Sequence, residues 1–408
     1  MCGIIGYTGY KPAAAILLDG LARLEYRGYD SAGVAILDEN GTMCIKKCSG
    51  KLNALVTSLG GRSPAGRIGV GHTRWATHGK PTDANAHPHL DCKGNVAVIH
   101  NGIIENYLDL KAELQEKGHV FCSQTDTEVL AHLVEEYLGQ GLSLEEAARQ
   151  AMSRTEGAQA VIILSTVEPD RMIAARTGNA GGMVIGYGNN EMFIASDLSA
   201  ILPYTQRMVF LGNLEMASVT TRGASYSTIQ GAPLRKSPQT VALDPVAAAK
   251  GGYKHFMLKE IMEQPEALMN TLRGRVDFDP PAVILEDVPF SKEDIRSIRR
   301  IVLLACGTSL HAALVGKFLI EGMAQIPAEA EYASEFRYHD PIVGPDTLVV
   351  SVGQSGETVD TLAAMEEARE KGARQITICN VPGSQASRMA DGVIYIRAGL
   401  ELAVASTK

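Results

Sequence analysis

The chain has 408 residues, which at about 150 residues per domain predicts two or three domains. A hydrophobic share of 45% and a charged share of 21% are ordinary for a globular protein and exclude intrinsic disorder. The net charge of −8, with 38 dispersed Lys and Arg, argues against a nucleic-acid partner. No apolar run reaches the about 18 residues that a membrane span requires.

The cysteines and the N-terminal residues bear on the compartment. Seven cysteines form an odd set without a C-x-x-C pair or a metal-ligand spacing, which favours a reducing compartment. The first residues, MCGIIGYTGYK, lack the basic and apolar segments of a secretory signal. We therefore expect a cytoplasmic protein.

Residues 1–235 combine short strands with amphipathic helices. Alternating runs such as SAGVAIL and NVAVIHNG are separated by Gly, Asn and Asp, as in antiparallel strands. Residues 11–24, 103–117 and 126–152 place apolar side chains at helical spacing. This part is predicted to be α+β, with helices covering the sheets.

The pattern of predicted helices and strands changes after residue 235. Residues 236–290 hold one helical stretch between Pro, Gly and charged residues, and we interpret them as a connector. From residue 298, apolar strands alternate with helices, which predicts a right-handed parallel sheet. The last residues read as a strand, a loop and a small-residue helix start, so Lys408 falls where an element would be expected to continue.

Cys2 is the first candidate for chemistry. Removal of Met1 would leave its thiol beside its own α-amine, which titrates near pH 8 and suits a general base. The alternative is a structural cysteine in the first strand.

Polar segments follow several predicted strands. Residues 71–81 crowd hydrogen-bond donors into one loop, which indicates a polar ligand. Asn101 and Gly102 end a buried strand and offer two donors of the kind that an oxyanion needs. Asp126 lies near a helix start and is either its cap or a ligand-binding carboxylate.

These segments together resemble the N-terminal-nucleophile glutaminase domain of the glutamine–fructose-6-phosphate aminotransferase family, also called glucosamine-6-phosphate synthases. The resemblance rests on a series of motifs in the family's order: MCGIIGY, LEYRGYDSAG, HTRWATHG, NAHPH, HNGIIEN, TDTEV and FIASD. It implies a layered α-β-β-α fold with antiparallel sheets over residues 2–235.

The resemblance also implies roles for individual residues. Cys2 would attack the glutamine amide, with Asn101 and Gly102 stabilising the oxyanion. Arg74 would bind the substrate α-carboxylate and Asp126 its α-ammonium. The loop that closes over glutamine would contain Trp75, Thr77 and His78.

A metal site is the other interpretation that we considered for this half. His87 and His89 lie two residues apart and near His78, but no Cys or carboxylate completes a ligand set there. We expect no metal site and no cofactor.

Two loops in the second half contain the candidate binding residues. Residues 306–309 and 353–358 each follow an apolar strand and open a helix, where free N–H groups and small hydroxyls suit a phosphate. Each loop alone could be a helix cap, but two on successive strands favour an anion site.

These loops resemble the first sugar isomerase (SIS) domain of the same family, an α/β fold with a parallel sheet, here over residues 291–408. The motifs are ACGTS, ASEFRY, QSGET, CNVPGS and VASTK. The resemblance places seven residues around fructose 6-phosphate: Thr308, Ser309, Gln354, Ser355, Thr358, Val404 and Ser406. Gly353 departs from the Ser that is usual in the family and removes one hydroxyl donor.

The family reaction would convert L-glutamine and D-fructose 6-phosphate into D-glucosamine 6-phosphate and L-glutamate. The family's Schiff-base lysine, enolising glutamate and ring-opening histidine have no counterparts among these residues, and Lys408 is not a substitute. We therefore expect glutamine hydrolysis and partial sugar-phosphate binding from a C-terminally truncated chain, and a homodimer for the full-length family. The alternative is a non-catalytic sugar-phosphate sensor with a relic glutaminase.

Overall fold

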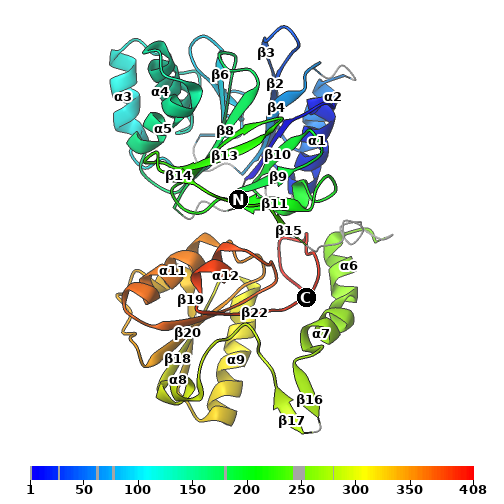
Figure 1. The fold of residues 1–408 in the computed structure, drawn as a ribbon, viewed down its shortest axis with the longest axis vertical. Coiled ribbons are helices and arrows are strands. Elements are labelled where there is room, and N and C mark those ends of the chain that lie inside the picture. The colour runs from blue at the N-terminus through cyan, green and yellow to red at the C-terminus, as the bar shows by residue number, and fades with distance from the viewer. Residues whose placement is uncertain are drawn as a thin grey trace. The chain divides into compact units, whose positions relative to one another are not determined.

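A computed structural model describes residues 2–25, 28–60, 64–75, 79–178, 182–241, 253–278 and 280–408. The chain divides into two compact units, Met1–Ala242 and Leu243–Lys408 (Figure 1). No helix among the described residues is long and apolar enough to cross a membrane.

Two sheets with antiparallel pairing form the centre of the first unit. The first has the order β15-β11-β9-β10-β1-β4-β2-β3 and the second the order β14-β13-β12-β8-β7-β6-β5. The strands of the first sheet are β1 (Gly3–Thr8), β2 (Ser31–Leu37), β3 (Met43–Ser49), β4 (Ile68–Arg74), β9 (Val184–Tyr187), β10 (Met192–Ala195), β11 (Arg207–Phe210) and β15 (Gln239–Thr240). The strands of the second sheet are β5 (His89–Leu90), β6 (Val96–Gly102), β7 (Gln159–Ser165), β8 (Arg171–Thr177), β12 (Glu215–Thr220), β13 (Gly223–Thr228) and β14 (Pro233–Leu234).

The main core lies between these sheets. Ile4 and Val70 of the first sheet belong to one buried cluster with Ile99 and Ile162 of the second. Successive side chains of a strand point to opposite faces of the sheet, so the side chains of the second sheet that point away from this core contact helices. The apolar runs of the sequence therefore become strands that are covered on both faces.

Helices form the outer layers of this unit. On the first sheet lies α1 (Ala13–Leu24), where a Cβ on Gly20 would come within 2.0 Å of Ile5 Cδ1. The second sheet shares a buried cluster with α3 (Tyr107–Glu116), α4 (Glu128–Gly139) and α5 (Leu144–Arg154). The remaining helices are α2 (Leu52–Ser58) and the short 3₁₀ helix η2 (Leu198–Ala200). The predicted α-β-β-α layering is confirmed.

The predicted helix over 126–152 is wrong in one respect, because the structure breaks it into α4 and α5. Gly141 has a φ of +86°, a conformation that glycine adopts readily, and it follows the end of α4. Ser143 then caps α5 by accepting a hydrogen bond from the Glu146 N–H at 3.3 Å. The apolar spacing continued through a turn that these two residues specify.

The second unit contains a five-stranded parallel sheet, as predicted. Its order is β19-β18-β20-β21-β22. The strands are β18 (Arg300–Ala305), β19 (Ala328–Tyr332), β20 (Thr347–Val352), β21 (Arg374–Cys379) and β22 (Gly392–Tyr395). The helices are α8 (Lys292–Ser297), α9 (Thr308–Ala324), α10 (Ala333–Phe336), α11 (Val359–Glu370) and α12 (Gln385–Met389). One face packs on α9 and the other on α10 and α11.

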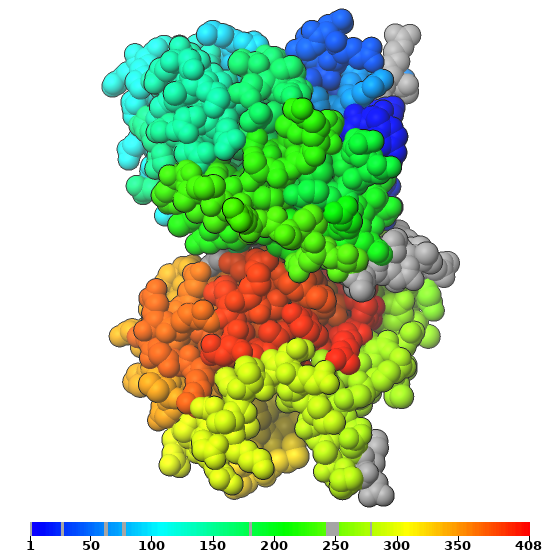
Figure 2. Space-filling view, viewed as in Figure 1, coloured from blue at the N-terminus to red at the C-terminus, as the bar shows by residue number. Residues whose placement is uncertain are grey.

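The segment predicted as a connector contains more structure than expected. It holds two helices, α6 (Phe256–Met262) and α7 (Gln264–Leu272), and a hairpin of β16 (Val276–Phe278) and β17 (Pro281–Val283). Glu260 of α6 accepts hydrogen bonds from the N–H groups of Leu402 and Ala403. In Figure 2 the C-terminal residues (red) accordingly lie beside α6 (yellow-green) within the same unit.

The expected helix start at residues 404–408 is not helical in the structure. The Glu401 carboxylate accepts hydrogen bonds from the N–H groups of Thr407 and Lys408, at 2.8 and 3.0 Å, and from the Ser406 hydroxyl. These bonds fold the segment back on itself as a loop.

Candidate active site

Cys2 directly precedes β1, which is an interior strand of the first sheet between β10 and β4. Because β1 and β4 are antiparallel, the start of β1 lies beside the end of β4, with Gly3 opposite Thr73. The Trp75 N–H, one residue beyond β4, points at the thiol and lies 3.2 Å from Cys2 Sγ. The sheet register therefore places the thiol against the polar loop that follows β4.

Gly28 allows this loop to be held closely. A Cβ at Gly28 would lie 2.7–2.9 Å from the backbone atoms of Thr73, Arg74 and Trp75, closer than side-chain carbons approach. The next turn is fixed by a hydrogen bond of 3.0 Å from the Asp30 N–H to the Arg74 carbonyl. Gly28 thus allows close support of the backbone that faces Cys2.

Asn101 reaches Cys2 from the second sheet. Its Nδ2 donates to the Cys2 carbonyl at 3.0 Å, and its Oδ1 lies 3.2 Å from His72 Nε2. The same His72 nitrogen is 3.1 Å from the His100 carbonyl, so two oxygen acceptors assign the proton to Nε2. Burial lowers the pKa of His72 to about 3. A neutral imidazole therefore fixes which end of the carboxamide faces Cys2.

Gly102 follows directly and requires glycine. Its φ is +128°, and a Cβ there would lie 2.0 Å from the Ala158 carbonyl oxygen. The strand β6 therefore ends with an exposed backbone position next to the Asn101 carboxamide.

Arg74 and Asp126 are buried groups of opposite charge that interact electrostatically, and Arg74 also interacts with Cys2. Arg74 is 3% exposed and Asp126 is 4% exposed. Burial lowers the pKa of Arg74, and the charges of Cys2, Asp126 and Asp30 oppose that shift. Asp126 Oδ2 accepts from the Ile104 N–H at 2.8 Å, and Thr127 is the cap residue of α4. The side chain of Asp126 therefore bonds across to the β6–α3 loop.

The other predicted glutamine-binding residues have mixed outcomes. Trp75 is 42% exposed and meets the Tyr29 ring edge-on at 5.4 Å between centroids. Thr77 and His78 lie outside the described residues. His87 stacks on His72 with centroids 4.1 Å apart. Within the described ranges, neither His87 nor His89 belongs to a group of three or more potential metal ligands.

The predicted sugar-phosphate loops follow neighbouring parallel strands. β18 pairs with β20, so residues 306–309 and 353–358 leave the same edge of the sheet side by side. The sheet order reverses direction between these two strands, which is where ligands bind in open α/β sheets. Thr308 Oγ1 donates to the Ser406 carbonyl at 3.3 Å and brings the C-terminal loop to the same edge.

The second loop is seated on the loop after β21. Gly356 has a φ of +65°, and a Cβ there would lie 2.2 Å from Ser384 Oγ. Glu357 Oε1 accepts from the Gln385 N–H at 2.8 Å. A small pocket beside this contact is lined by Gly353, Gly356 and Thr358, among others. Ser384 ends the CNVPGS motif but is not among the seven residues that the resemblance places around the sugar phosphate.

Several predicted sugar-site side chains make local contacts. Ser355 Oγ accepts from the Glu357 N–H at 3.1 Å, and Gln354 contributes its carbonyl to the Asn380 N–H at 2.9 Å. Ser309 is half-buried at the start of α9. Val404 is 76% exposed. Lys408 Nζ pairs with Glu263 at 2.8 Å, and its side chain is largely buried.

Comparison with known protein families finds one domain match in each unit. Residues 72–203 match the model of the glutamine amidotransferase domain, and residues 294–408 match the SIS domain. A solved structure titled as the allosteric regulatory enzyme of purine biosynthesis has a TM-score of 0.52 at 20% identity. It covers 92% of this chain and 80% of that one, and it supports the fold alone.

Curated relatives match over the whole chain. The glutamine–fructose-6-phosphate aminotransferase (isomerizing) of Symbiobacterium thermophilum is 50% identical over 100% of this chain and 66% of that protein. The Chlorobaculum tepidum protein of the same name is 48% identical over 100% of this chain and 67% of that protein. The chain thus spans about two thirds of the length of these relatives, and it belongs to the glutamine–fructose-6-phosphate aminotransferase (isomerizing) family.

Proposed function

We propose that the first unit hydrolyses L-glutamine through Cys2 and that the second binds D-fructose 6-phosphate as the acceptor of the released ammonia. The observation that carries the proposal is the convergence on Cys2 of the Trp75 N–H and the Asn101 carboxamide, from the two different sheets. The family reaction forms D-glucosamine 6-phosphate, and for these 408 residues alone we propose its glutaminase step together with partial sugar-phosphate binding.

The first step requires Cys2 as the N-terminal residue. After Met1 is removed, the α-amine takes the thiol proton, and Sγ attacks the amide carbon of glutamine. The carbon–nitrogen bond then breaks, ammonia leaves with that proton, and a glutamyl thioester remains on Cys2. Water hydrolyses the thioester to glutamate and restores the thiol.

Asn101 and the Gly102 N–H are the proposed oxyanion donors. Nδ2 of Asn101 already lies 3.0 Å from the Cys2 carbonyl oxygen. His72 Nε2–H orients the carboxamide by donating a hydrogen bond to its Oδ1 end. The NH₂ end is therefore left on the side of the reacting atoms. Preorganised donors of this kind require no rearrangement as the negative charge develops.

Arg74 and Asp126 are the proposed partners of the two charges of glutamine. Both are buried, so a bound zwitterion would meet them with little screening by water. Arg74 would pair with the α-carboxylate and Asp126 with the α-ammonium. Trp75, Thr77 and His78 remain the proposed closing loop.

The sugar-phosphate site is proposed at the edge where β18 and β20 end. Two observations support it: the adjacent helix starts of α9 and α11, and the reversal of strand order between these strands. The proposed contacts are Thr308, Ser309, Gln354, Ser355, Thr358, Val404 and Ser406. We propose residues 2–235, 236–290 and 291–408 as glutaminase, connector and SIS domain.

The test measures products and labelling on the purified chain. We expect release of glutamate from glutamine, no glucosamine 6-phosphate, and alkylation of Cys2 by an electrophilic glutamine analogue. The Cys2→Ala variant should lose both hydrolysis and labelling, whereas Cys122→Ala, a matched change at an exposed cysteine, should lose neither.

Two results would contradict the proposal. Equal hydrolysis by Cys2→Ala would place the nucleophile elsewhere. A correctly trimmed chain that binds fructose 6-phosphate but is neither labelled nor active would favour the non-catalytic sensor.

A further inference from the structure

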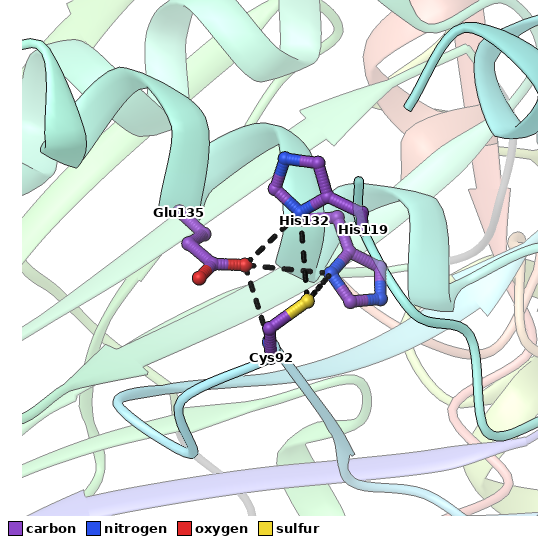
Figure 3. Close-up of side chains that lie close together, drawn as sticks. All are labelled: Cys92, His119, His132 and Glu135. Carbon is purple, nitrogen blue, oxygen red and sulfur yellow. Dashed lines mark hydrogen bonds and ion pairs between the residues drawn. The ribbon is translucent and has the colours of Figure 1, made fainter. Parts of the chain in front are cut away.

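Four side chains of the first unit converge at a place that the proposed glutaminase chemistry does not use. They are Cys92, His119, His132 and Glu135, and their ligand atoms all lie within 4.8 Å of one another (Figure 3). We propose that these four residues form a structural Zn²⁺ site.

The interatomic distances fit a single tetrahedral ion. Cys92 Sγ lies 3.5 Å from His132 Nδ1 and 3.7 Å from His119 Nδ1. Glu135 Oε2 lies 3.1 Å from His119 Nδ1 and 3.5 Å from His132 Nδ1. Zinc bonds of about 2.3 Å to sulfur and about 2.0–2.1 Å to nitrogen or oxygen put tetrahedral ligand atoms about 3.3–3.6 Å apart. One ion therefore fits with small movements of the side chains.

The donor set selects the class of metal. One thiolate, two imidazoles and one carboxylate are typical of zinc, whereas magnesium and calcium prefer oxygen ligands. A thiolate, a carboxylate and two neutral imidazoles carry two negative charges, which balance a divalent cation. Four protein ligands leave no open position, so the site is structural in type.

Three separate segments are fixed locally so that they present these ligands. His132 and Glu135 are three residues apart on one face of α4. Cys92 lies in the β5–β6 turn, whose Asp91 Oδ1 accepts from the Val96 N–H at 2.8 Å. His119 follows α3, and its N–H donates to the Leu114 carbonyl at 3.0 Å.

The surroundings support ligation by His132 in particular. Its second nitrogen, Nε2, is buried and lies 3.7 Å from Glu128 Oε1, one turn earlier on α4. A carboxylate behind the distal nitrogen is the usual orienting partner of a metal-bound histidine. Cys92 is exposed, so an ion could enter from solvent.

Zinc would connect this site to the segment that carries Asp126. Glu128 Oε1 and Oε2 also accept from the N–H groups of Cys122 and Ser123, at 2.6 and 2.7 Å. An ion that fixes His132 would therefore stabilise the start of α4 and the loop before it.

The test uses the full chain, stripped of metal with a chelator and titrated with Zn²⁺ alone. We expect one equivalent to bind and to raise the melting temperature. Cys92→Ser and His119→Gln should each weaken binding by at least a hundredfold, more than typical second-shell changes. Cys122→Ser is the matched control at a nearby exposed cysteine, and it should bind as the wild type does.

Two further measurements locate the ion. Co²⁺ in place of Zn²⁺ should give a sulfur-to-cobalt charge-transfer band that Cys92→Ser abolishes. Zn²⁺ should protect Cys92, but neither Cys122 nor Cys2, from alkylation. All these readouts are independent of glutamine hydrolysis.

Binding of less than one equivalent would overturn the proposal and leave a hydrogen-bonded cluster. Unchanged affinity in Cys92→Ser, with circular dichroism showing that the variant is folded, would also overturn it. So would protection of Cys2 in place of Cys92, because the ion would then lie at the glutaminase centre.

Discussion

In the first unit, Arg74, Asn101 and Asp126, which we propose to act on glutamine, are buried, whereas the proposed sugar-site side chains of the second unit lie on exposed or half-buried loops. Asn101 is 6% exposed and is fixed by His72, which is itself buried among histidines. Thr308 and Ser355 reach solvent and form hydrogen bonds with backbone atoms, and Val404 is exposed. We therefore expect the proposed amide chemistry to depend on a buried polar interior, and the proposed phosphate binding to depend on backbone N–H groups at the ends of strands.

The largest expected effect is a loss of stability in acid that is confined to the first unit. Burial lowers the pKa of His72 to about 3, and it holds those of His87 and His89 well below the ordinary value. The unfolded chain therefore binds more protons below about pH 6.5, and stability falls as pH falls from there. The range from pH ~7.5 to ~5.5 spans the unfolded pKa of about 6.5, so each histidine costs about 1.4 kcal/mol in total over it, and three cost about 4 kcal/mol.

Urea unfolding at these two pH values, followed by Trp75 fluorescence, measures this loss in the first unit. His89→Gln should remove about a third of the pH dependence. His339→Gln is the control in the second unit, because a hydrogen bond to Glu331 raises the pKa of that exposed histidine. If the free energy of unfolding of the first unit is equal at both pH values, the buried histidines do not make this unit sensitive to acid.

The next effect is on catalysis in the first unit. Asn101→Ala removes a proposed oxyanion donor and should lower kcat for glutamine hydrolysis by about 10²–10³-fold, or about 3–4 kcal/mol. The KM for glutamine should change little, because Arg74 and Asp126 remain. Steady-state kinetics on the purified chain gives both values, and a kcat within threefold of wild type would remove Asn101 from the mechanism.

A smaller effect is expected from the packing of the second unit. Gly356→Ala forces a side chain into a φ of +65° and against Ser384 Oγ, and it should cost about 1–3 kcal/mol. Gly372→Ala is the matched control, because its φ is +80° but its nearest neighbour lies at 3.8 Å. Calorimetry should show a larger loss for Gly356→Ala. Equal losses would mean that the contact with Ser384 contributes nothing.

The fold was largely predictable because its signals are local. Buried strands such as Ser31–Leu37 follow from alternating runs, and the parallel sheet follows from the alternation of strands and helices. The break between α4 and α5 was missed because the apolar spacing continues across Gly141. The hairpin at 276–283 was missed because its exposed residues carry little periodicity.

The candidate site was predictable only where a residue lies in a motif. Asn101 and Arg74 stand at strand ends that the sequence marks, whereas the support of Asn101 by His72 depends on pairing between two sheets. The Cys92 group is the clearest gap. Its members come from a turn, a loop and a helix, so their spacing in the sequence does not match a metal-binding motif. We therefore predicted no metal site there from the sequence.

The smallest effect concerns the one position where the sugar loop departs from the family pattern. Gly353 has no neighbour within 4 Å of an added Cβ, and its φ lies outside the left-handed range, so a serine fits without strain. Gly353→Ser should restore a hydroxyl donor and raise the affinity for fructose 6-phosphate by about two- to tenfold, or about 0.5–1.5 kcal/mol. Gly353→Ala is the control for backbone stiffening alone, and calorimetric titration compares the three chains. If serine and alanine act alike, the phosphate is held by backbone N–H groups, and the contrast between the two units is sharper than the side chains suggest.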